Sequence, residues 1–330
     1  MRGSKQKVKS GNITVAVCGA TATGKTSLAL MLAERENGEI ISSDSMQLYR
    51  GMDIGTAKPT SDELLRVPHH MIDVLEPDEH CSVANYAAMA EQAEADIRRR
   101  GKLPIYCGGT GLYLDAIMYK NKFSESQDPE AEKESTLRAE KYLAENGAEA
   151  LHSLLVRLDP TAAEAIHPNN TRRVIRAIVI CETTGKTKTE WDAASRGEVR
   201  DDAVVLGLRF ADRELHRRAI EKRCGEMIKS GLVEETARLY EIGALDAGKT
   251  AAQAIGYKEL FPYIKGEETL KDAEMRLFYA TCRYAKRQAT WFYRKDYVNW
   301  LEVDDLYLGK ETKDELYRRA AKLIDEKTGG

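Results

Sequence analysis

The chain has 330 residues, of which 42% are hydrophobic and 31% are charged, and its formal net charge is −3 at pH 7. This composition is typical of a globular protein with a large core and room for two domains. The weak negative charge gives no indication of a nucleic-acid partner, which a local basic patch would have to bind. Long apolar segments and an apolar signal core in the first residues are absent from the sequence, so we expect a cytoplasmic protein without a membrane contact.

A glycine-rich segment stands between a predicted strand and a predicted helix near the start of the chain. Residues 13–18 are a short apolar, β-branched run typical of a buried parallel strand, and a helical apolar pattern follows residue 26. The segment matches the phosphate-binding loop pattern G-x-x-x-x-G-K-[ST] at every fixed position. Its residues are Gly19, Ala20, Thr21, Ala22, Thr23, Gly24, Lys25 and Thr26. We predict a phosphate site in which Lys25 adds charge and Thr26 offers a hydroxyl to Mg²⁺, although the loop does not identify the phosphate compound.

Two further predicted strands end in polar turns. Residues 39–42 lead into Asp44, and residues 103–107 lead into a glycine turn that contains Thr110. In parallel sheets, ligand-binding and catalytic residues lie at the carboxyl ends of the strands. We therefore expect both turns to lie beside the phosphate-binding loop. Two interpretations of Asp44 are equally open: it acts as a base or assists a magnesium ion, or it caps the N-terminus of a helix. The glycine-punctuated loop 50–59 that follows is long enough to favour a functional role.

The pattern changes between residues 119 and 200, where strand signals are nearly absent. We therefore predict an α/β protein divided into 1–118, the first part of a parallel-sheet core; 119–200, a helical insertion; and 201–330, the completion of the core and C-terminal helices. A strand is expected at residues 203–208, and the C-terminal third is expected to be helical. In the insertion, Arg172, Arg173 and Arg176 share one helix face, which either binds phosphates or is simply solvated.

A long amphipathic helix is predicted from residue 273 to residue 294. Arg283, Lys286, Arg287 and Arg294 alternate there with Tyr284, Trp291 and Phe292. Cations beside aromatic rings suit a single-stranded nucleic acid, because cations bind phosphates and rings stack on bases. Core aromatics beside surface charges are the alternative interpretation.

Eight segments, taken together and in this order, resemble the tRNA dimethylallyltransferases of the bacterial type. They are residues 19–26, 43–49, 51–59, 68–70, 108–113, 172–177, 231–235 and 255–259. The resemblance extends from about residue 14 to residue 301. It implies transfer of a dimethylallyl group from its diphosphate to the exocyclic N6 amine of the adenosine 3′ of the anticodon in tRNA, with release of diphosphate. It also implies a core like that of P-loop nucleoside triphosphatases, with an insertion that binds the anticodon stem-loop.

The resemblance also implies a set of site residues. The loop Gly19–Thr26 would hold the dimethylallyl diphosphate with Mg²⁺ at Thr26, and Lys25 and Arg223 would stabilise the leaving diphosphate. Asp44 would be the general base, and Thr110 would contact substrate and diphosphate. The tRNA-binding residues implied are Asp44, Ser45, Met46, Gln47, Thr110, Arg172, Arg173, Val174, Ile175, Arg176, Gln253, Ala254, Ile255, Gly256, Tyr257, Lys258 and Glu259.

The chain departs from the family pattern at residues 123–133, which lack the arginine that the family has at the start of the insertion. We also expect the protein to be a monomer. Three other functions share some of these features. An ATP-dependent small-molecule kinase shares the loop, and an adenylate prenyltransferase shares the core and the donor. The third is a non-catalytic RNA-binding protein that depends on a nucleotide. The segment 55–59 and the predicted insertion favour the tRNA enzyme, while Asp44 and Thr110 beside the loop argue for catalysis.

Overall fold

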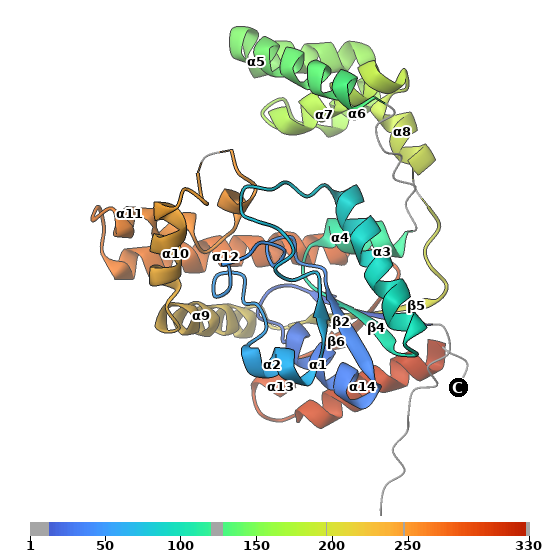
Figure 1. Ribbon diagram of the computed structural model, residues 1–330, viewed down its shortest axis with the longest axis vertical. Coiled ribbons are helices and arrows are strands. Elements are labelled where there is room, and N and C mark those ends of the chain that lie inside the picture. Colours follow the sequence, from blue (N-terminus) through green and yellow to red (C-terminus); the bar gives the residue numbers. More distant parts are fainter. Residues whose placement is uncertain (1–12, 120–127, 196, 247, 328–330) are drawn as a thin grey trace, which may run out of the picture. The chain divides into compact units, whose positions relative to one another are not determined.

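The computed structural model describes residues 13–119, 128–195, 197–246 and 248–327. The chain splits into two compact units (Figure 1). We call Met1–Met118 with Arg200–Gly330 the core unit, and Tyr119–Val199 the insertion unit.

The core unit is built on a six-stranded sheet in the order β3-β2-β4-β1-β5-β6, and every recorded pairing is parallel. The strands are β1 (Thr14–Gly19), β2 (Gly38–Ser42), β3 (His69–His70), β4 (Leu103–Cys107), β5 (Ala203–Arg209) and β6 (Val298–Glu302). The predicted parallel α/β core is therefore confirmed. The expectation of a wholly helical C-terminal third is wrong at β6, where only Val298 and Leu301 are buried and the apolar signal is correspondingly weak.

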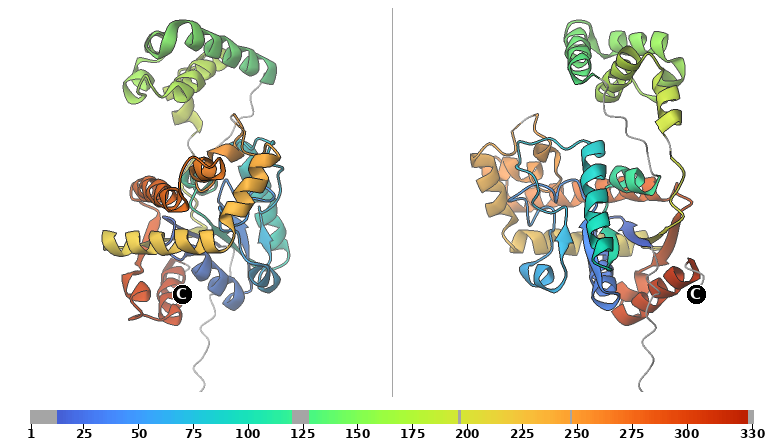
Figure 2. Two further views of the ribbon diagram at one scale, coloured as in Figure 1. Left: turned by 90° about the vertical axis from the view of Figure 1, so that its left-hand side faces the viewer. Right: turned by 45° about the vertical axis from the view of Figure 1, so that its right-hand side comes forward.

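Helices cover both faces of the sheet because successive strand side chains point to opposite sides. Val15 and Val17 of β1 pack with helices α1 and α14, while Ala16 and Cys18 pack with α3, α4 and the end of α12. Figure 2 shows these helices against the sheet from two further directions. Their bounds are α1 (Lys25–Arg35), α3 (Val83–Arg99), α4 (Gly111–Met118), α12 (Leu270–Phe292) and α14 (Lys313–Lys327).

A third core joins the remaining helices of this unit to the segment after β2. Tyr49 and Met52 are fully buried there against residues such as Leu232 and Leu277. The elements in this part of the unit are α9 (Arg213–Lys229), α10 (Leu232–Glu241), η1 (Ala251–Gln253), η2 (Lys258–Leu260) and α11 (Phe261–Ile264). The loop after β2 is thus fastened to helices from the other end of the chain. Two short helices of the core unit lie outside this third core: α2 (Ser61–Arg66) has no buried residue, and α13 (Asp304–Tyr307) packs Leu306 against the core of Val15 and Val17.

The insertion unit consists of helices over its described residues. They are α5 (Pro129–Leu158), α6 (Pro160–Ala165), α7 (Thr171–Thr184) and α8 (Lys188–Ser195). Gly147 breaks α5 with a φ of 83°. Leu151, Leu155 and Val174 are fully buried in a separate small core.

The core unit closes where the insertion begins and ends. The Arg200 N–H donates to the Met118 carbonyl at 2.8 Å. The Arg200 guanidinium donates to Glu94 at 2.7 Å and to Asp202 at 2.8 Å. Burial opposes the ionisation of Glu94, but hydrogen bonds and charge from Arg200 outweigh it and lower the pKa of Glu94 to about 2. Within the described chain, none of the helices is both long and apolar enough to cross a membrane.

Candidate active site

A cavity of about 250 Å³ lies in the core unit beside the residues that follow β1, β2 and β4. Four groups predicted to act in the same site line it, namely Lys25, Thr26, Asp44 and Arg223. They come from the phosphate-binding loop, the turn after β2 and α9, and Gly108 and Gly109 add the turn after β4. The fold therefore brings together segments that are far apart in the sequence.

The phosphate-binding loop has the tight backbone that its glycines allow. Gly19 has a φ of 135°, and a Cβ there would lie 2.4 Å from the Leu208 carbonyl oxygen, so a side chain would not fit. The Lys25 ammonium donates to the Ala20 carbonyl at 2.8 Å and closes the loop on itself. Burial lowers the pKa of Lys25 to about 8, and the positive charge of Arg223 acts in the same direction.

Gln288 on α12 connects this loop to the turn after β4. Its Oε1 accepts the Thr21 N–H at 2.8 Å, and its Nε2 donates to the Gly109 carbonyl at 3.0 Å. On the other side of the loop, His216 donates from Nε2 to the Thr21 carbonyl at 2.9 Å. Sequence reasoning missed both residues, because a glutamine on a basic helix and a lone histidine carry no local signal of such a role.

Asp44 follows β2 and begins a turn. Its Oδ1 accepts the Met46 N–H at 2.9 Å, and the helix-cap alternative is wrong because residues 45–48 form turns. Burial raises the pKa of Asp44 above its usual value, and the charges of Lys25 and Arg223 oppose that shift. Burial also lowers the pKa of Arg223.

Thr110 belongs to the turn after β4 and contacts the turn after β2. Its hydroxyl accepts the Ser45 N–H at 3.0 Å, and its own N–H donates to the Ser43 carbonyl at 3.1 Å. The residue therefore holds the Asp44 turn to the turn after β4. Ser45, which it positions, lines the cavity.

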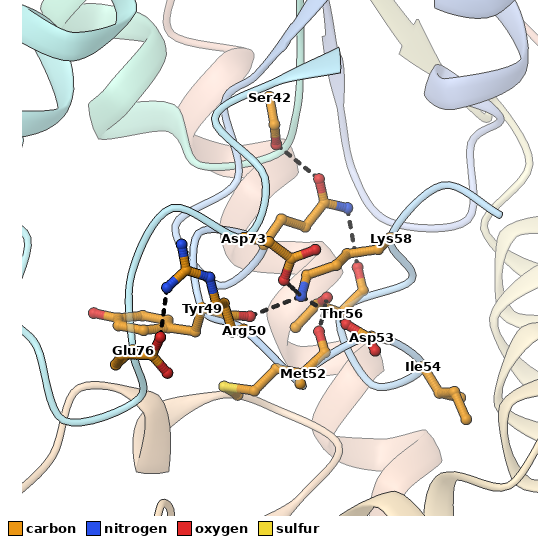
Figure 3. Close-up of polar contacts among 12 residues, drawn as sticks. Ser42, Tyr49, Arg50, Met52, Asp53, Ile54, Thr56, Lys58, Asp73 and Glu76 are labelled. Atoms are coloured by element: carbon orange, nitrogen blue, oxygen red, sulfur yellow. Dashed lines mark hydrogen bonds and ion pairs between the residues drawn. The ribbon is translucent and has the colours of Figure 1, made fainter. Parts of the chain in front are cut away.

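The loop that contains residues 51–59 forms another wall of the cavity. Lys58 places its ammonium between the Tyr49 carbonyl, at 2.7 Å, and the carboxylates of Asp53 and Asp73, at 2.7 and 2.6 Å, as Figure 3 shows. Gln47, a predicted RNA contact, donates to the Thr56 and Ala57 carbonyls at 3.2 Å and accepts from Ser42 at 2.7 Å. The Gln47 side chain is thereby fixed at the cavity edge.

Glu235 on α10 holds the same loop from behind. The buried carboxylate accepts the N–H groups of Asp53, Ile54 and Gly55 at 2.9 to 3.0 Å, together with the Tyr257 hydroxyl at 2.8 Å. These bonds join the segments 51–59, 231–235 and 255–259, which the sequence alone left unconnected.

The predicted RNA-contacting segment 253–259 divides into two parts. Gln253, Ala254, Ile255 and Gly256 line the cavity. Tyr257 and Glu259 are buried instead, and Glu259 accepts the Gly256 N–H at 2.9 Å. Their positions support the protein itself, so we do not retain them as RNA contacts. Lys258 is exposed.

The predicted RNA-binding helix in the insertion unit is also only partly accessible. Arg172, Arg173 and Arg176 of α7 are exposed, and Arg176 forms an ion pair with Glu132. Val174 is fully buried and Ile175 is half-buried in the unit's own core. Val174 is therefore a packing residue and not an RNA contact. Residues 123–127 of the divergent segment 123–133 lie outside the described residues.

On α12, the two interpretations of the basic and aromatic residues apply to different side chains. Phe292 is fully buried, and the Trp291 indole donates to Asp115 at 3.1 Å. The exposed cations share a surface groove, which is lined by Arg283, Lys286, Arg287, Thr290, Trp291, Arg294 and Lys295. Phe292 thus packs inside and the half-buried Trp291 lies along the groove, while the exposed cations form a basic surface.

Clusters of three or more histidine, cysteine or acidic residues suited to a metal ion are absent from the described chain. Thr26 lines the cavity at the start of α1 and carries a hydroxyl. One protein hydroxyl fits a Mg²⁺ ion that is held mainly by phosphate oxygens and water, which is a usual mode for this cation.

Comparison with known proteins places these features in a family context. The family model for IPP transferase matches residues 47–296, and the model for isopentenyl transferase matches residues 12–74. A tRNA dimethylallyltransferase of Caldanaerobacter subterraneus subsp. tengcongensis is 44% identical over 93% of this chain and 97% of its own. The protein of that name from Bacillus subtilis (strain 168) is 45% identical over 92% of this chain and 93% of its own.

Solved structures give the same result. The tRNA isopentenylpyrophosphate transferase from Bacillus halodurans is 40% identical, with a TM-score of 0.68 over 97% of this chain and 99% of its own. A eukaryotic dimethylallyltransferase acting on tRNA is 29% identical, with a TM-score of 0.80 over 93% of this chain and 77% of its own.

Proposed function

The chain belongs to the tRNA dimethylallyltransferase family, and from this premise we propose which of its residues carry out the transfer. The protein is a prenyltransferase that transfers a dimethylallyl group to adenosine in tRNA. The family uses dimethylallyl diphosphate as the donor. The observation that carries the residue assignment is that Lys25, Arg223 and Asp44 line one cavity with the phosphate-binding loop.

We assign the donor diphosphate to the loop Gly19–Thr26. Within the described chain, the N–H groups of residues 22–26 donate to no protein acceptor, so they are available to phosphate oxygens. The N-terminus of α1 adds partial positive charge at the same place. Lys25 at the start of α1 and Arg223 on α9 each add a positively charged side chain to the cavity lining.

The reaction then follows from where these charges lie. The N6 nitrogen forms a bond with C1 of the dimethylallyl group, the C1–O bond breaks, and its electrons leave with the diphosphate. Asp44 takes the proton that N6 loses. Because burial raises the Asp44 pKa, its carboxylate is a stronger base than an exposed aspartate. Lys25 and Arg223 stabilise the negative charge that develops on the leaving diphosphate.

Magnesium fits this site as a partner of the diphosphate. Thr26 would contribute its hydroxyl, and the ion would add positive charge beside the leaving group. Lys25 and Arg223 stabilise the negative charge of the leaving diphosphate directly, and neither residue serves as a ligand of the metal ion.

We assign tRNA binding to the exposed arginines of α7, to Ser45, Met46 and Gln47, and to Gln253–Gly256. As the family resemblance implies, we propose that the RNA element bound by the insertion is the anticodon stem-loop. The target adenosine has to leave its stack to enter the cavity, as base-modifying enzymes require. The basic groove on α12 is suited to the flanking phosphates. We propose that one chain carries a complete site and works as a monomer.

A parallel assay tests the substrate. Dimethylallyl diphosphate with a labelled prenyl group is offered to the protein with tRNA, AMP and ATP in separate reactions. We expect label in tRNA at N6 of the adenosine 3′ of the anticodon. Efficient labelling of AMP would identify an adenylate prenyltransferase instead, and ATP consumption without prenyl transfer would identify a kinase.

A further inference from the structure

We propose that Gln288 limits the phosphate-binding loop to two phosphoryl groups, and so makes the cavity select a diphosphate over a nucleoside triphosphate. The inference rests on the proposed function, in which this loop holds the diphosphate of the donor. It concerns a residue for which the sequence predicted no role.

The first argument is the use of a backbone donor. Phosphate-binding loops hold their ligand with successive N–H groups that point into the loop. Here the Thr21 N–H is already bonded to Gln288 Oε1 at 2.8 Å, and both groups are buried. A phosphoryl group at this end of the loop would have to replace that bond. The N–H groups available to an anion therefore begin at Ala22.

The second argument is that Gln288 is held in place from two sides. Its Nε2 donates to the Gly109 carbonyl at 3.0 Å, which fixes the orientation of the amide so that Oε1 faces Thr21. A Cβ on Gly109 would lie 2.1 Å from this nitrogen, so the close approach depends on the glycine. The side chain is 5% exposed and lines the cavity. Gln288 thus occupies the end of the loop as a fixed wall.

The third argument is that Thr21 is fastened on its other side as well. His216 donates to the Thr21 carbonyl at 2.9 Å, and burial lowers the pKa of His216, which keeps the ring neutral. A neutral ring adds no charge for a third phosphoryl group. The backbone N–H and carbonyl of Thr21 are therefore both engaged, and His216 adds no cation at this end of the loop. The N–H groups of residues 22–26 and the Lys25 ammonium lie in the other half.

The test compares inorganic pyrophosphate with inorganic tripolyphosphate, each with Mg²⁺, by isothermal titration calorimetry. For the unaltered protein we expect tripolyphosphate to bind about tenfold more weakly. Gln288→Met frees the Thr21 N–H at nearly constant volume, and Gln288→Ala frees both the N–H and the space. We expect Gln288→Ala to reduce the preference to about one and to make ATP a competitor of dimethylallyl diphosphate. Gln288→Met, which frees the N–H but still fills the space, should reduce the preference only in part. Met275→Ala, at an exposed site on the same helix, is the control.

The outcomes separate the possible errors. A preference that is unchanged in folded variants, as judged by the same Tm as the control, would make Gln288 a structural tie only. Equal binding of the two anions by the unaltered protein would overturn the inference even if the variants do not fold. A protein that binds neither pyrophosphate nor dimethylallyl diphosphate would instead contradict the proposed function.

Discussion

The Tyr257 hydroxyl donates to the Glu235 carboxylate at 2.8 Å, inside the core unit and next to the loop that walls the cavity. The same carboxylate accepts three successive backbone N–H groups of residues 53–55. One buried side chain therefore connects the segment that carries Gln253–Gly256 with the segment that carries Gly55–Ala57. Both segments line the cavity, so Glu235 positions two of its walls at once.

Replacing Glu235 should consequently affect both stability and turnover. In Glu235→Ala, the N–H groups of residues 53–55 and the Tyr257 hydroxyl lose their acceptor. Since buried donors without a partner are costly, we expect the free energy of unfolding to fall by about 1–3 kcal/mol. Urea unfolding measures this loss, and turnover with tRNA should fall alongside it. The neighbouring Glu234 is exposed, so Glu234→Ala is the matched control. Equal losses in the two variants would remove the special role of Glu235.

Asp44→Asn should bind both substrates and lose most of its turnover. The amide keeps the shape of the side chain but cannot take the N6 proton, so we expect a loss of about 10²–10⁴-fold. Single-turnover rates with saturating tRNA measure it, and the exposed Asp62→Asn serves as the control. A rate near that of the unaltered protein would show that Asp44 only shapes its turn.

The pH dependence of diphosphate binding should report on Lys25. The pKa of Lys25 is about 8 in the ligand-free protein, so its ammonium is charged below pH 8 and becomes neutral above it. The diphosphate becomes more negative as pH rises, which by itself would strengthen binding. Lys25 acts in the opposite direction, and we therefore expect pyrophosphate affinity to weaken between about pH 7 and about pH 9.5. In Lys25→Arg the charge persists across this range, so the weakening should disappear. A decline of the same size in that variant would assign the effect to another group.

The exposed arginines at the start of α7 should contribute to tRNA affinity through phosphate contacts. Arg176 already pairs with Glu132, so Arg172 and Arg173 are the better pair to replace. In the double variant Arg172→Gln and Arg173→Gln, we expect weaker tRNA binding and unchanged affinity for the donor. Each lost contact should reduce the slope of log affinity against log salt by about 0.7–0.9.

A control with the same change of charge completes that experiment. Lys141 and Lys186 are exposed cations elsewhere in the insertion unit, and replacing both with Gln removes two charges as well. The slope should change in the α7 variant and remain constant in the control. The same change in both would indicate a general charge effect, and no change in either would make the α7 face a solvated surface.

Local sequence patterns were sufficient for the strands β1, β2, β4 and β5 and for the helical character of the chain between β4 and β5, because each has a periodicity of its own. They failed where a role depends on distant partners. Thr21 and Gln288 are 267 positions apart, and no local signal links them. The resemblance placed Val174 and Tyr257 among the RNA contacts, yet both are buried. A motif can recur within a family because its residues pack the core or because they bind a ligand. The sequence of the segment alone does not distinguish these two reasons.

The hydrogen bond between the Arg200 N–H and the Met118 carbonyl has a consequence for how such an enzyme can change its acceptor. The two points where the intervening helices leave and rejoin the core unit are adjacent backbone positions. The strands on either side, β4 and β5, are each paired to β1 and need no residue of the insertion for their register. A short turn between Met118 and Arg200 would close the chain again. The helices of residues 119–199 therefore form a separable unit. Gene fusion or deletion could insert, replace or remove this unit while the residues assigned to the prenyl donor stay in place.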